Sequence, residues 1–156
     1  MINRFFLAAL ITVSFFIVIY SCSSEDATID IGVKINEIKD DVATGTWRIT
    51  SFIDSGNNET SDFTGYNFTF NENGTLKASN GTDTVTGSWS VTEDDNSDDD
   101  DDFDDEIDFN ISFLAPDNFT DLSDDWDITS ASATKIDLID ISGGNGGTDT
   151  LTFEKN

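Results

Sequence analysis

From residue 45 to residue 155, apolar and polar residues alternate with a period of two, in short runs that Gly, Asn and Asp residues separate. This alternation is typical of a β-strand with one buried face, because successive side chains point to opposite sides of a strand. The runs predict eight strands, at residues 45–50, 65–70, 75–78, 84–91, 107–113, 125–129, 134–141 and 150–155.

Two details of the pattern predict local geometry. The dipeptide Asn73-Gly74 stands between two of the runs and predicts a tight hairpin turn. In the run 134–141 the apolar phase changes between Leu138 and Ile139. A change of phase inside a strand indicates one extra residue in the ladder, so we expect a β-bulge there.

A different period precedes the strands. Ile35, Ile38 and Val42 recur at the spacing i, i+3, i+7, which places them on one face of a helix. The sequence therefore predicts one short amphipathic helix before the first strand, and few helices elsewhere.

Evenly spaced strands joined by short turns favour an antiparallel all-β fold. We expect an eight-stranded up-and-down barrel over residues 45–156, since eight strands close around side chains or around one small ligand. The alternative is a β-sandwich of the immunoglobulin type. Strand pairing distinguishes the two, because in the barrel sequence neighbours pair throughout and the first strand meets the last.

Residues 1–21 have the composition of an export signal. Arg4 is their only charged residue, and residues 5–20 are almost continuously apolar. Sixteen residues fall short of the about 20 that a membrane-spanning helix needs. The stretch ends at Ile19-Tyr20-Ser21-Cys22, which resembles the lipobox of bacterial lipoproteins, and Cys22 is the only cysteine of the chain.

The lipobox resemblance implies that the chain is cut before Cys22 and that this residue carries acyl chains, which anchor the protein to a membrane. Residues 1–21 would then be the signal peptide and residues 22–44 a lipidated tether with the short helix. The pair Glu25-Asp26 is similar to the acidic export signal of surface lipoproteins in Bacteroidetes. We therefore expect the outer membrane, at its surface or its periplasmic face, with the surface favoured.

Charge narrows the range of partners. Without residues 1–21 the chain has six Lys and Arg against 32 Asp and Glu, a net charge of −26. A protein this acidic repels nucleic acid and other polyanions. The sequence has no His, and its only thiol is assigned to the lipid, so the usual general base and thiolate nucleophile are missing. We expect neither a nucleic-acid partner nor an enzyme.

Two short motifs resemble those of lipocalins. The tripeptide GTW at 45–47 is similar to the G-x-W signature of that family, and GSW follows at 87–89. With the hairpin sequence at 66–76, the pattern resembles lipocalin-like lipoproteins of Bacteroidetes. The resemblance implies a barrel in which Trp47 plugs one end. No arginine follows Arg48, so the chain lacks the closing arginine that packs on this tryptophan in lipocalins.

The resemblance also implies that a small apolar molecule binds inside the barrel. The inward positions of the predicted strands, which would contact it, carry Trp47, Tyr66, Phe68, Phe70, Trp89, Phe109, Phe113, Trp126 and Phe153. Rings of this size leave little room in a barrel of eight strands. The alternative is therefore a surface or structural lipoprotein with a filled barrel, and the volume argument favours it.

One segment is acidic enough to attract cations. Residues 93–108 contain twelve acidic residues among sixteen, and carboxylates are the ligands that Ca²⁺ prefers. An EF-hand starting at Asp95 fails, because its sixth position is Asp100 rather than Gly. We expect a solvated loop that binds Ca²⁺ weakly, with no other cofactor. Its candidate ligands are Asp98, Asp99, Asp100, Asp101, Asp102, Asp104, Asp105 and Glu106.

Overall fold

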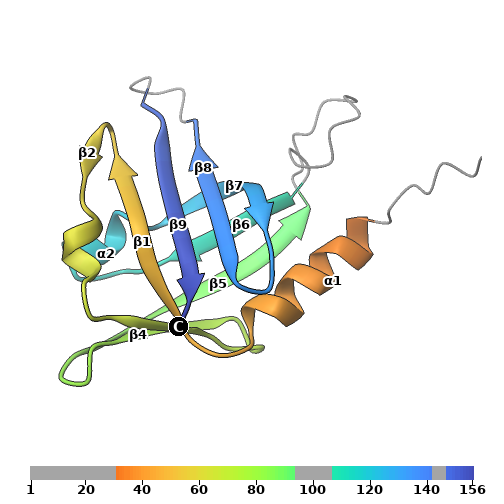
Figure 1. The fold of residues 1–156 in the computed structure, drawn as a ribbon, viewed down its shortest axis with the longest axis horizontal. Helices are drawn as coiled ribbons and strands as arrows, with labels where there is room; N and C mark the ends of the chain where they lie inside the picture. The colour runs from red at the N-terminus through yellow and green to blue at the C-terminus, as the bar shows by residue number, and fades with distance from the viewer. Residues whose placement is uncertain (1–30, 94–106, 142–146) are drawn as a thin grey trace, which may run out of the picture.

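The computed structural model describes residues 31–93, 107–141 and 147–156 (Figure 1). In chain order its elements are α1 (Ile31–Val42), β1 (Trp47–Asp54), β2 (Asn57–Asn58), the 3₁₀ helix η1 (Thr60–Phe63), β3 (Asn67–Phe70), β4 (Thr75–Ser79), β5 (Thr84–Glu93), β6 (Ile107–Ser112), α2 (Asp117–Thr120), β7 (Asp124–Ala131), β8 (Lys135–Asp140) and β9 (Asp149–Lys155). Within these ranges, none of the helices is long and apolar enough to cross a membrane.

The strands form one antiparallel sheet that closes on itself. From β3 to β9 each strand pairs with the next in sequence, and β1 pairs with both β3 and β9. The two-residue β2 only extends the end of β1, so β1 and β3–β9 make a closed barrel of eight strands. This pairing confirms the predicted barrel and excludes the β-sandwich.

The seam between β1 and β3 is the weakest part of the ladder. It holds a single residue pair, Trp47 with Phe68, and η1 lies beside β1 where pairing stops. There the backbone N–H of Phe52 donates to the Thr60 hydroxyl at 2.8 Å, and the N–H of Glu59 donates to the Phe52 carbonyl at 3.0 Å. A side chain and a turn thus satisfy backbone groups that would otherwise be buried without partners.

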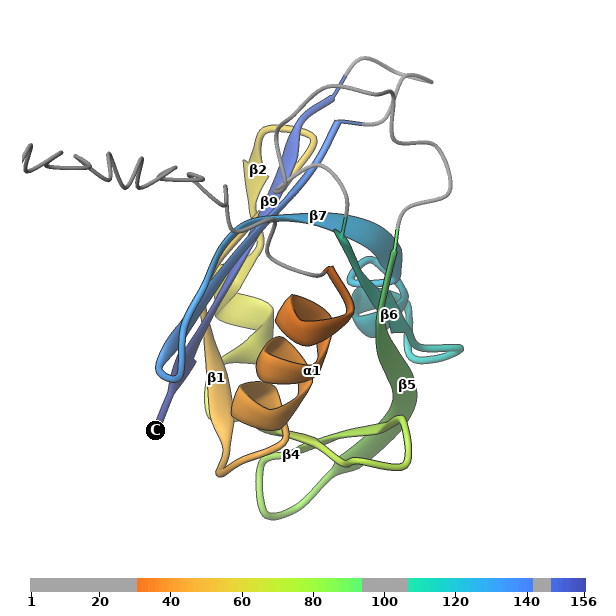
Figure 2. The ribbon, with the colours of Figure 1, turned by 90° about the vertical axis from the view of Figure 1, so that its right-hand side faces the viewer.

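The N-terminal helix lies across one open end of the barrel (Figure 2). Ile38 and Val42 are buried against the core, and Ile35 packs beside them half-buried. The predicted helix is therefore confirmed, with its apolar face turned to the barrel.

The bulge predicted between Leu138 and Ile139 is wrong. β8 pairs with β9 in continuous register along its whole length. The irregularity lies in the neighbouring strand, where the register of β7 against β8 shifts between Ile128 and Ser130. Because the buried Leu138 fixes the register of β8, Ile139 faces outward and Ile141, after the strand, is 67% exposed.

The second G-x-W motif contains a close approach. A β-carbon at Gly87 would overlap the Ser112 carbonyl oxygen and would lie 2.6 Å from Cδ1 of Phe113. Trp89, two residues further along β5, is buried and donates its indole N–H to the Asn71 carbonyl at 2.9 Å. Gly87 leaves room for the Phe113 ring, and the Trp89 indole holds the β3–β4 turn through its hydrogen bond to Asn71.

We predict that Gly87→Ala lowers the free energy of unfolding by about 1–3 kcal/mol. The added methyl group would overpack the contact between β5 and Phe113. Urea unfolding followed by tryptophan fluorescence measures the loss. Ser88→Ala, on the outer face of the same strand, is the control and should change stability by less than about 0.5 kcal/mol. Equal stability of the two variants would contradict the assigned packing.

Candidate functional site

The barrel interior is the site that the sequence predicts. Of the nine predicted inward aromatic residues, eight have exposed fractions between 0% and 7%, namely Trp47, Phe68, Phe70, Trp89, Phe109, Phe113, Trp126 and Phe153. Tyr66 departs from the expectation. It precedes β3, is half-buried and lies with its ring centroid 5.2 Å from that of Phe119, at the edge of the core.

The buried rings pack against one another across the barrel. Phe70 contacts Trp89, Phe109 and Phe153 edge to face, at centroid distances of 5.3, 5.7 and 5.4 Å. Phe68 contacts Phe153 at 5.4 Å. These separations are those of aromatic pairs in direct contact. Rings from β3, β5, β6 and β9 therefore meet in the middle of the barrel.

The end of the barrel beneath α1 is closed by Trp47 and Lys155. The Trp47 indole donates to the Val42 carbonyl at 2.9 Å, which ties the last turn of α1 to β1. The Lys155 ammonium lies 4.8 Å from the centroid of the Trp47 ring and donates to the Thr44 hydroxyl at 2.8 Å and to the Asp41 carbonyl at 3.3 Å. A lysine thus packs on the tryptophan at this end of the barrel.

The opposite end is closed by two phenylalanines from short helices. Phe63 of η1 and Phe119 of α2 are 2% and 0% exposed, and their ring centroids are 5.3 Å apart. Phe63 also contacts Phe52 at 5.7 Å, and Phe119 contacts Phe113 at 5.1 Å. The mouth through which a ligand would enter the barrel is therefore occupied by side chains.

Three surface hollows border the barrel. One of about 360 Å³ lies between α1 and residues 128–132, and one of about 370 Å³ lies between α1 and the β3–β4 turn. The third, of about 640 Å³, lies on the outer face of β5–β7 and is lined by polar side chains such as Asn110 and Asp125. Of the buried aromatic residues, only Trp89 lines any of the three.

Acidic side chains gather at the η1–α2 end. Three half-buried aspartates, Asp54, Asp140 and Asp149, each lie two positions from a buried residue of the same strand, which places them on the inner face of β1, β8 and β9. Asp124, at the start of β7, lines the third hollow. The Ser55 N–H donates to Asp149 at 2.6 Å. The six Lys and Arg of the described chain lie on α1, on β4 or at the α1 ends of β1, β8 and β9, so none of them neutralises this end.

Three carboxylates at this end could hold a divalent cation. Oxygens of Asp54, Glu59 and Asp121 lie within 4.8 Å of one another, and oxygens of this kind are the ligands of Ca²⁺. Burial, and then the charges of Asp54, Asp121 and Asp62, raises the pKa of Glu59. The sequence did not predict this group, because its members come from three separate segments.

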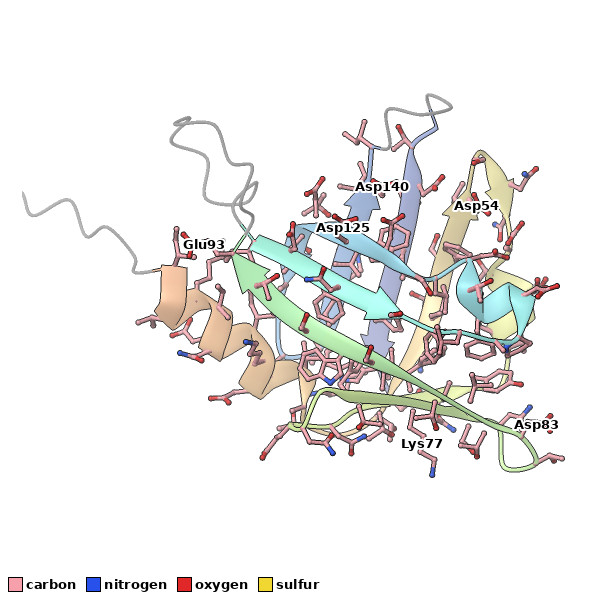
Figure 3. All side chains as sticks on the ribbon, turned by 180° about the vertical axis from the view of Figure 1, so that it is seen from behind. Asp54, Lys77, Asp83, Glu93, Asp125 and Asp140 are labelled. Carbon is pink, nitrogen blue, oxygen red and sulfur yellow. The ribbon has the colours of Figure 1, made fainter. Side chains whose placement is uncertain are left out.

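Two predicted sites lie outside the described residues. These are the lipidation site at Cys22 and the acidic run from Asp98 to Glu106. The two strands on either side of the run in sequence are described: β5 ends at Glu93 and β6 begins at Ile107. Figure 3 shows Glu93 beside α1, at the end of the barrel opposite Asp54.

Comparison with known proteins shows similarity to a solved structure but to no family model. No family model matches the chain, and no curated protein matches it. Among solved structures, a DUF4847 family protein from Bacteroides vulgatus matches with 18% identity over 76% of this chain and 97% of that chain, with a TM-score of 0.47. The closed eight-stranded antiparallel barrel with its short N-terminal helix fits a lipocalin-like fold.

Of the residues that close the two ends, Trp47 was expected from the G-x-W motif, whereas Phe63, Phe119 and Lys155 were not predicted. Phe63 and Phe119 each stand alone among polar residues, without the period of two. A lone large aromatic residue in a polar loop is the signal that could have found them. Lys155 continues the alternation of Leu151 and Phe153, so its position alone predicts an inward direction at the end of β9.

We predict that Lys155→Met lowers the free energy of unfolding by about 0.5–2 kcal/mol, because a cation over a partly desolvated indole contributes in that range. The same substitution should speed amide hydrogen exchange in α1, since it removes two hydrogen bonds to residues 41–44. Thermal unfolding and exchange measured by mass spectrometry test both effects. Lys77→Met, at an exposed position on β4, is the control, and an equal response of the two variants would contradict the closing role.

Proposed function

We propose that the protein is a lipid-anchored envelope protein whose lipocalin-like barrel is a filled scaffold, acting through its outer surface and not through an internal ligand site. The observation that carries this proposal is the aromatic core. Pockets for small molecules have volumes of about 300–1,000 Å³. Inside this barrel that space is taken by rings such as Phe70, Phe109 and Phe153, at centroid distances of 5.4 to 5.7 Å.

The closure of both ends supports the same proposal. Trp47 with α1 covers one end, and Phe63 with Phe119 covers the other. A ligand would have to displace rings that are at most 2% exposed, at a cost comparable to opening the core. We therefore favour the filled barrel over a carrier of a small apolar molecule.

Surface chemistry restricts what the scaffold can contact. The formal net charge of −25 favours cationic or neutral partners over anionic ones. We infer that the protein is not an enzyme, since its sequence has no His and no thiol beyond Cys22. We also propose that the acidic run at 94–106 attracts divalent cations weakly and that salt reduces this binding.

We predict that the purified domain, residues 31–156, does not bind N-phenyl-1-naphthylamine, a neutral probe that fluoresces in apolar cavities. Phe119→Ala should bind it, because the substitution removes a ring from the closed mouth and leaves a cavity. Phe119→Leu is a milder variant if the alanine variant does not fold. Saturable probe binding by the unsubstituted domain, or an apolar molecule retained in native mass spectrometry, would overturn the filled-barrel proposal.

We predict that the full chain, produced in a bacterium that processes lipoproteins, is recovered in the membrane fraction as a form that begins at Cys22 and carries acyl chains. Intact-mass spectrometry measures both the cleavage and the added mass. Cys22→Ser, which keeps the size but removes the thiol, should appear unacylated. Unmodified Cys22 in the parent chain, or equal membrane retention of an unacylated Cys22→Ser chain, would contradict the anchor and leave the barrel proposal standing.

A further inference from the structure

The outer face of β1, β9 and β8, three strands that lie side by side, has a formal net charge of zero (Figure 1). Its charged residues stand at outward positions, two basic and two acidic, namely Arg48, Lys135, Asp137 and Glu154. The wall formed by β5, β6 and β7 contains acidic residues and no Lys or Arg. In a chain with a formal net charge of −25, a second acidic protein can therefore approach the β1–β9–β8 face without facing excess negative charge.

The charges on this face are already paired within the chain. The Arg48 guanidinium lies 3.1 Å from the Glu154 carboxylate across β1 and β9, and the Lys135 ammonium lies 2.8 Å from the Asp137 carboxylate. The Thr152 hydroxyl also donates to Asp137 at 2.9 Å. A charge that keeps its partner and its hydrogen bonds is less costly to remove from water than an unpaired one. The face can therefore be covered by another surface without leaving a charge unpaired.

A row of isoleucines lies on the same face. Ile53 of β1 and Ile139 of β8 are both cross-strand partners of Thr150 of β9, so the three side chains form one outward row, called the isoleucine row below. Ile53 and Ile139 are half-buried without packing on the core, and Ile141, just beyond β8, is 67% exposed. Strand propensity does not account for Ile141, since it lies outside the strand. Apolar side chains gathered on an outer face indicate a contact surface.

The two ends of the face differ in charge. Arg48 and Lys135 are both cross-strand partners of Glu154, and these three residues form a charged row at the α1 end. The isoleucine row lies towards the η1–α2 end, where Asp127 of β7 is the cross-strand partner of Ile139. That end is acidic, and the Lys and Arg of the described chain lie elsewhere. Cations at one end and acids at the other make the face complementary to a copy of itself with reversed strand direction.

We propose that the β1–β9–β8 face binds a second copy of the same chain, in a two-fold dimer whose strands run in opposite directions across the interface. The two-fold axis lies along the row between the two described above, which contains Ser51, Thr152 and Asp137. The charged row of each copy then lies over the isoleucine row of the other. The aliphatic stems of Arg48 and Lys135 pack on isoleucine, and their charged ends lie near the acidic end of the partner.

The dimer should be weak and reversible. Strands lie about 4.8 Å apart and rise about 3.3 Å per residue, so three short strands offer less than the about 800 Å² per partner of a standard interface. Asp137 lies near its own copy across the axis, although Lys135 compensates its charge within each chain. We therefore expect a dissociation constant of about 10⁻⁵–10⁻³ M. This pairing goes beyond the filled barrel and needs neither it nor the anchor, so its failure would leave both standing.

Sedimentation equilibrium of the domain, residues 31–156, tests the pairing, because all the described contacts lie within these residues. Ile139→Glu should weaken dimerisation at least about tenfold, since it places a charge in the isoleucine row. Leu114→Glu adds the same charge at a 93% exposed position before α2 and is the matched control, with a change of less than about twofold. A parent domain that is monomeric at about 1 mM, or equal weakening in both variants, would overturn the dimer.

Disulfide cross-linking locates the axis, because the domain has no cysteine of its own. Thr152→Cys should form a covalent dimer on mild oxidation, since a residue on a two-fold axis faces its own copy. Ser51→Cys, in the same row on β1, replaces it if the loss of the bond to Asp137 prevents folding. Thr86→Cys, at an exposed outward position of β5, is the control, and equally fast cross-linking there would contradict the assigned face. A monomeric parent that binds phosphatidylcholine vesicles through Ile139 would assign the face to a membrane and overturn the dimer.

Discussion

Large aromatic rings packed inside a closed barrel are the constraint on which the rest of this structure depends. A barrel of eight strands has an interior just wide enough for side chains. Here rings in edge-to-face contact pack across that interior, including Phe52 of β1 against Trp126 of β7 at 6.4 Å. The rings determine where glycine must stand, as at Gly87 beneath Phe113.

The same constraint explains the two short helices at one end. Phe63 and Phe119 enter the core from segments that are not strands, so the ladder beside each is interrupted. Hydroxyl groups replace the missing ladder bonds. Thr60 pairs with the backbone of Phe52, and Ser123 pairs with the backbone of Phe113, accepting from its N–H at 2.8 Å and donating to its carbonyl at 3.2 Å. Beside each ring that closes the mouth, a hydroxyl group thus forms the hydrogen bonds that the interrupted sheet leaves unmade.

The strands and the wall of the core follow from alternation, because a period of two fixes which side chains face inward. The repeated pairing of Trp, Phe and Ile with Ser, Thr and Asn along β5 and β6 is enough to predict their buried faces. The bulge was misplaced because an apolar residue at a strand end, such as Ile141, can lie in solvent when a buried neighbour sets the register. The end closures and the acidic end could not be predicted this way. Each depends on contacts between residues far apart in sequence, as when Lys155 packs on Trp47.

A filled barrel interior encloses little void volume. Pressure unfolding measures that volume directly, because the volume change on unfolding grows with the void space that unfolding eliminates. For the domain, we predict a change near the small end of the usual range of about −20 to −100 mL/mol, and a clearly more negative one for Phe70→Ala, which opens a void at the meeting point of three rings. A large negative change in the unsubstituted domain, left unaltered by Phe70→Ala, would mean that the barrel already encloses a cavity and would contradict this account.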